Sequence, residues 1–84
     1  MLAKKVVREV MVKTGIGTSE MARKLGKPAR LVSDRLGLDK STNLSTDKMC
    51  EFLDVMGYRL VVMPSDEPMK DGWYEVTGSK SDDE

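Results

Sequence analysis

Histidine is absent from the 84 residues of this sequence, and cysteine occurs once, at Cys50. Without an imidazole base a lone thiol is poorly activated as a nucleophile, and the usual Cys and His ligands of a zinc site are missing. A single cysteine forms no internal disulfide, which suits the reducing cytoplasm. A glycine-rich phosphate loop is also missing. We therefore expect a cytoplasmic protein that is not an enzyme and that uses no metal or other cofactor.

Long apolar runs are missing too. The longest, Leu60 to Met63, falls far short of the ~20 residues that span a bilayer, and the N-terminal segment lacks the continuous apolar region of a signal peptide. Aromatic residues make up only 5% of the chain, which leaves few rings for stacking on unpaired RNA bases. We expect no membrane partner, and RNA binding is the weaker of the nucleic-acid hypotheses.

Charge is unevenly distributed along the chain, although the formal net charge is zero. Residues 1–63 hold 12 Lys or Arg and 7 Asp or Glu, whereas residues 64–84 hold 2 and 7. A basic body attracts polyanions over about a Debye length, ~8 to 10 Å. The C-terminal part is acidic, and we expect residues 79–84 to form a disordered acidic tail.

Four short amphipathic patterns, at residues 2–13, 18–25, 28–37 and 45–56, predict four helices within a single domain. In the first, an apolar stripe faces inward and the charged residues fall largely on the other side: Lys4, Lys5, Arg8, Glu9 and Lys13. Residues 59–63 and 73–78 are strand-like and could pair as a hairpin. Because a lone hairpin is only marginally stable in water, we expect it to lie on the helices, to pair with a second subunit, or both.

The stretch from Thr18 to Gly37 places two of these helices on either side of a very short turn. Two helices that cross at about 90 to 120° need a small side chain at the crossing, and Ala22 supplies one. Gly26 relieves the backbone where the chain reverses. Val32 and Leu36 then hold the second helix against the core and leave its opposite face outside.

These residues resemble the helix-turn-helix of the phage repressor and Cro family, the Xre-type DNA-binding domains. The family places a small residue in the first motif helix, a glycine four residues later and a β-branched residue ten after the small one, as Ala22, Gly26 and Val32 do here. The stretch from Val55 to Tyr58 is similar to the end of the family's following helix, and the resemblance covers roughly residues 4–63. Two departures are Lys27, where the family usually has an apolar residue, and the lack of glutamines at the base-reading positions.

The resemblance implies a mainly α fold: a compact four-helix helix-turn-helix domain over residues 1–63, followed by a C-terminal β-strand or β-hairpin within residues 59–78. It also implies that residues 28–37 form a recognition helix that enters the major groove of double-stranded DNA. On that helix we expect base contacts from Ala29, Arg30, Ser33 and Asp34. An arginine suits the O6 and N7 atoms of guanine, and an aspartate accepts from the cytosine amine.

The remaining predicted sites surround this helix or join two protomers. Phosphate contacts are expected from Ser19, Lys27, Arg35, Lys40, Ser41, Thr42 and Asn43. The dimer interface is expected to use Leu60, Val62, Trp73 and Tyr74. A homodimer on a palindromic operator would place its two recognition helices about one DNA turn apart, ~34 Å.

The function favoured by these features is transcription regulation of phage or mobile-element type, with repression as the preferred role. The competing hypothesis is a protein-binding module, such as an antitoxin or a phage-encoded inhibitor of host defence (anti-CRISPR-like). In that case the acidic segment 64–84 would be the binding arm. An unrelated small helical bundle is the remaining alternative.

Overall fold

Helix α1 (Ala3–Thr14) forms because its apolar residues recur at the spacing of one helical face. Val6, Val7, Val10 and Met11 are all buried on that face. Gly15 ends the helix at φ 72°, a left-handed conformation that costs glycine little, and its N–H bonds the carbonyl oxygens of the last turn.

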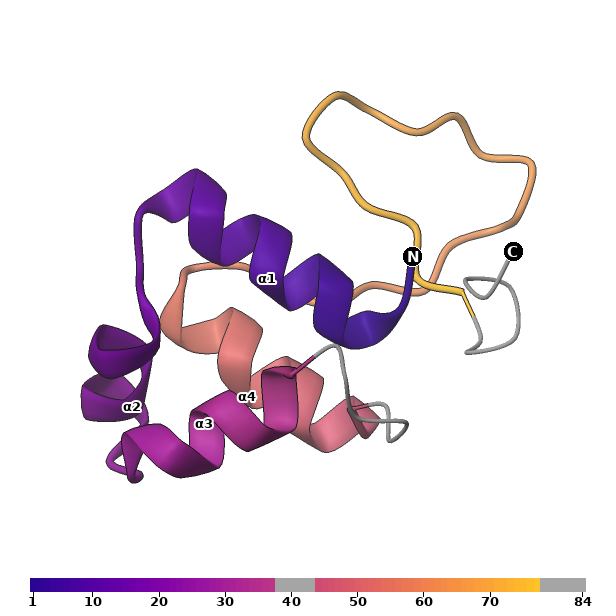
Figure 1. Cartoon of the computed structure of the whole chain (residues 1–84). Coiled ribbons are helices and arrows are strands. Elements are labelled where there is room, and N and C mark those ends of the chain that lie inside the picture. Colours follow the sequence, from indigo (N-terminus) through magenta and orange to yellow (C-terminus); the bar gives the residue numbers. More distant parts are fainter. Residues whose placement is uncertain (38–43, 78–84) are drawn as a thin grey trace.

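The computed structural model describes residues 1–37 and 44–77, and Figure 1 shows their arrangement. Three further helices follow α1: α2 (Thr18–Leu25), α3 (Ala29–Leu36) and α4 (Thr46–Val55). The predicted mainly α fold is therefore confirmed, and each helix lies within about a residue of its predicted bounds. The predicted phosphate contacts at Lys40, Ser41, Thr42 and Asn43, and the predicted tail at 79–84, lie outside the described residues.

One core holds the four helices together. Besides the buried residues of α1, it contains residues of α2, α3 and α4 and the cap residue after α4. These are Met21, Ala22, Val32, Leu36, Met49, Phe52, Leu53 and Met56. Methionines fill much of this space, because an unbranched thioether side chain adapts to irregular gaps between short helices. Ala22 is 4% exposed, as expected of the small residue between α2 and α3.

Pro28 and Ser45 begin α3 and α4. Pro28 was predicted to lie in the first turn of a helix over residues 28–37, but it is the N-cap, one position before α3 begins. Its carbonyl oxygen accepts from Leu31 N at 3.1 Å. Its φ of −64° suits either position because the pyrrolidine ring fixes that angle. The Oγ of Ser45 accepts from Lys48 N at 3.3 Å and so caps α4.

The C-terminal β-strand or hairpin is not confirmed. Within the described residues 59–77 the chain is extended or turning and contains no strand. Residues near its end pair instead with the N-terminus: the Met1 ammonium donates to the carbonyl of Glu75 at 3.0 Å, and Thr77 N donates to the carbonyl of Met1 at 2.9 Å. Figure 1 shows this long loop returning to the N-terminus, on the side of the molecule away from α2 and α3. A two-stranded ribbon is only marginally stable alone, so this arrangement is physically reasonable.

The turn between α2 and α3 depends on Gly26, which has φ 68°. We expect Gly26→Ala to lower the free energy of unfolding by about 1 kcal/mol or more, because a Cβ is strained in the left-handed region. Gly26→Asn is the matched control, since asparagine adopts the left-handed conformation more readily than alanine does. Urea unfolding of the two variants measures the difference, and equal midpoints would contradict a conformational requirement at Gly26.

Candidate nucleic-acid interface

The outer face of α3 holds three of the four predicted base contacts, whereas Ala29 begins the helix on the side of Val32 and Leu36. Ala29, Arg30, Ser33 and Asp34 are all exposed. The spacing of Arg30, Ser33 and Asp34, at i, i+3 and i+4, puts these three side chains on one side of the helix. Packing fixes which side is outermost, because Val32 and Leu36 are only 1% and 2% exposed.

The polar side chains of this face are not engaged by the protein. In the described ranges 1–37 and 44–77, no hydrogen bond or ion pair involves the side chains of Arg30, Ser33 or Asp34. A guanidinium offers a pair of N–H donors, a hydroxyl both donates and accepts, and a carboxylate accepts. Together they present a mixed donor and acceptor edge along about one turn of helix.

Cations gather where α2 turns into α3. Lys27 is half-buried in the turn, and Arg23 and Lys24 in the last turn of α2 are exposed. Arg23 lies 3.7 Å from Glu20 in a solvent-exposed pair, which contributes little to stability. Arg23 and Lys24 are not among the predicted phosphate contacts, although they belong to the same run of positive residues as Lys27 and Arg30.

The start of α2, at the other end of that helix, offers backbone donors. Ser19 is exposed in the first turn, as a phosphate contact requires. The N-cap is Gly17, which has no side chain to bond the free amides of that turn. Helix N-termini with free amides favour anions, so the predicted role of Ser19 is compatible with its surroundings.

Arg35 differs from the other predicted phosphate contacts. It is half-buried at the side of α3, and its Nε is buried without a hydrogen-bond partner among the described residues. Its guanidinium is thus only partly available at the surface. The helical position explains this, because Arg35 directly precedes the buried Leu36 and lies closer to the core side than Arg30 does.

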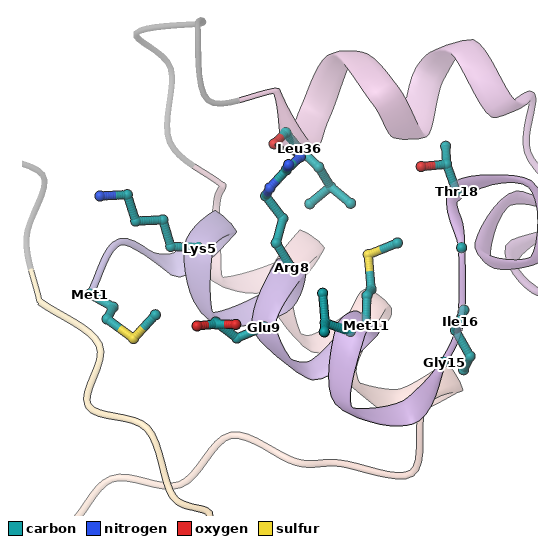
Figure 2. Close-up of a pocket in the computed structure, with 11 residues that line it drawn as sticks. Met1, Lys5, Arg8, Glu9, Met11, Gly15, Ile16, Thr18 and Leu36 are labelled. Carbon is teal, nitrogen blue, oxygen red and sulfur yellow. Dashed lines mark hydrogen bonds between the residues drawn. The ribbon is translucent and has the colours of Figure 1, made fainter.

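A groove of about 630 Å³ lies between α1, the loop at residues 15–17 and the end of α3 (Figure 2). Lys5, Arg8 and Glu9 of α1 line it together with the apolar Met11, Ile16 and Leu36. Arg8 extends across the groove, and its Nη1 donates to the carbonyl oxygen of Leu36 at 3.1 Å. No sequence motif indicated this groove, because its walls come from segments far apart in the chain.

Lys4 corrects the expected division of α1 into an apolar and a charged side. It is only 2% exposed, and its Nζ donates to the carbonyl oxygen of Gly37 at 2.9 Å. Lys4, Val7 and Met11 are spaced i, i+3 and i+7, so Lys4 borders the apolar stripe. That spacing is the signal by which its burial could have been suspected.

The predicted dimer residues occupy the C-terminal segment. Leu60, Val62 and Trp73 are exposed, with Val62 at 96%. Tyr74 is half-buried against the core, and Lys13 Nζ lies 5.8 Å from the centre of its ring. Beneath the segment is a second hollow of about 590 Å³, lined by residues 60–65 and 74–76 and by Ala3, Leu44, Thr46, Met49, Glu67 and Met69.

Comparison of the chain with models of known protein families, with curated proteins and with solved structures gives no match. The resemblance to the phage repressor and Cro family therefore rests on the motif residues and their spacing. No helix within residues 1–37 and 44–77 has the length and apolar character needed to cross a bilayer.

Proposed function

We propose that this protein binds double-stranded DNA in a sequence-specific manner, with α3 inserted into the major groove. The observation that carries the proposal is the outer face of α3, where Arg30, Ser33 and Asp34 are exposed and unengaged while Val32 and Leu36 fix the helix from behind. A major groove admits one α-helix and presents a distinct pattern of donors and acceptors for each base pair.

Each residue of the face has a role that follows from its chemistry. Arg30 pairs with O6 and N7 of guanine, Ser33 reads a neighbouring base edge and Asp34 accepts from a cytosine amine. Ala29 is small enough to allow close approach and contact with a thymine methyl group. Ser19, Lys27 and Arg35, together with the exposed Arg23 and Lys24, contact phosphates on both sides of the groove.

We further propose that the protein acts as a homodimer on a palindromic operator, as a cytoplasmic transcriptional regulator of phage type whose preferred role is repression. The exposed apolar run at Leu60, Val61 and Val62 supports the dimer, because apolar side chains in contact with water favour association. The predicted strands at 59–63 and 73–78 then form on pairing with a second copy, which supplies the partner that a single chain lacks.

Removal of the Arg30 guanidinium tests the proposed reading of bases. Against duplexes selected from random DNA, we expect Arg30→Ala to lose about 1 to 3 kcal/mol of discrimination and to relax choice at one base pair. Lys5→Ala is the control, because Lys5 carries the same charge on α1, outside both α3 and the predicted dimer strands. Fluorescence anisotropy over a salt series measures both, and equal losses in the two variants would argue for non-specific charge attraction alone.

An acidic side chain in the extended segment tests the dimer. We expect Val62→Asp to weaken self-association at least tenfold, because two buried carboxylates would face each other across the interface. Val12→Asp is the control, since Val12 is 79% exposed on α1 outside this segment. Sedimentation velocity over a range of concentrations gives the association constants, and a parent protein that stays monomeric both alone and on DNA would contradict the proposal.

A protein partner is the second candidate function, and one observation favours it. The C-terminal segment exposes large apolar side chains, among them Met69, Trp73 and Val76. The same region is rich in acidic residues. If a protein is the ligand, deleting residues 65–84 removes activity and Arg30→Ala has no effect. If DNA is the ligand, Arg30→Ala relaxes sequence choice.

A further inference from the structure

The C-terminal end of α3 is closed differently from the ends of the other helices. After α1, α2 and α4, a backbone N–H of the cap residue bonds carbonyl oxygens of the last turn. After α3, Gly37 has φ −65° and ψ 125°, which is extended backbone, and no such bond forms. The last carbonyl groups of α3 therefore need other donors.

Two cations of α1 donate to the last carbonyl of α3 and to that of its cap residue. Lys4 Nζ donates to the carbonyl of Gly37 at 2.9 Å, and Arg8 Nη1 donates to the carbonyl of Leu36 at 3.1 Å. The two residues are four apart, so their side chains leave α1 on the same side, one turn after the other. Figure 2 shows Arg8 reaching from α1 to the end of α3.

The burial of the charged Lys4 is a costly feature that needs an explanation. Positive groups are stabilising at a helix C-terminus, where the free carbonyls carry a partial negative charge. A buried ammonium is unfavourable unless it is hydrogen-bonded, and Lys4 is 2% exposed with its bond to Gly37 in place. Solubility alone would be served equally well by an exposed lysine.

The pair lies at the opposite end of α3 from the turn that joins it to α2. At its first end, α3 is held by the tight turn at Gly26 and by Ala22 between the two helices. At its last end, Lys4 and Arg8 tie it to α1. Contacts at both ends of a helix restrict its movement, which matters because side chains that read a ligand must be held to about 0.5 Å.

We propose that Lys4 and Arg8 are positioning residues for α3 and that, through it, they set how Ser33 and Asp34 meet the DNA. The claim that Lys4 and Arg8 affect DNA contacts rests on the function proposed above. The claim that they hold the end of α3 applies to the protein without DNA. Neither residue touches a base, and their effect on sequence choice is indirect.

Amide hydrogen exchange on the full chain without DNA tests the helix end. We expect Arg8→Met to speed exchange in the last turn of α3 about tenfold and to leave α4 nearly unchanged, because loss of a charged hydrogen bond frays the helix locally. Lys5→Met is the matched control on the same helix, and Arg8→Lys should restore most of the protection by keeping one donor. Lys4→Met should act in the same way, but Arg8 is exposed, so the Arg8 variants give an answer even if the Lys4 variant does not fold.

Competition between selected and scrambled duplexes tests the effect on reading. We expect Arg8→Met to lower the ratio of the two affinities about fivefold more than Lys5→Met does, with equal salt dependence in the two variants because each loses one charge. Equal exchange in Arg8→Met and Lys5→Met would overturn the helix-end role. Faster exchange in α3 with an unchanged affinity ratio would overturn the positioning role. If even the parent protein does not distinguish the duplexes, the proposed function fails, and hydrogen exchange still decides the role of Lys4 and Arg8.

Discussion

Burial of Val32 and Leu36 is the constraint on which the rest of the molecule depends. These two side chains are almost fully covered, and they fix one side of a helix that is only eight residues long. An isolated helix of that length is unstable in water, so α3 exists because its apolar side is packed. The same packing leaves Arg30, Ser33 and Asp34 at the surface. Stability and the exposed polar face thus have a single origin.

The remaining parts of the fold contact that small helix at both of its ends. Ala22 allows α2 to approach closely, Gly26 turns the chain sharply, and Lys4 and Arg8 hold the far end of α3. The C-terminal segment lies on another side of the molecule and is attached through Met1. The contacts proposed for DNA and those proposed for a second copy therefore fall on different sides of the molecule.

Local patterns were sufficient to predict the helices but not the contacts between distant segments. The spacing of apolar residues, with glycines near the helix ends, gave all four helices, and the same spacing separated Val32 and Leu36 from the outer face of α3. The prediction that Lys4 faces solvent was wrong because a periodic pattern assigns every lysine to the surface. In the fold, its ammonium donates a hydrogen bond to a carbonyl 33 positions further along the chain. Met1 bonds Glu75 and Thr77 across sequence separations of 74 and 76 positions. No local signal in the sequence encodes contacts over such a distance.

Mapping of the DNA-bound surface by NMR tests the central claim most directly. Labelled full-length chain is titrated with a duplex selected from random DNA, and amide and side-chain shifts are followed residue by residue. The largest changes should fall on Arg30, Ser33 and Asp34 and on Lys27 in the preceding turn, with smaller changes along residues 59–77. Changes confined to residues 59–77, with α3 unaffected at saturating DNA, would contradict the claim that the outer face of α3 reads the duplex.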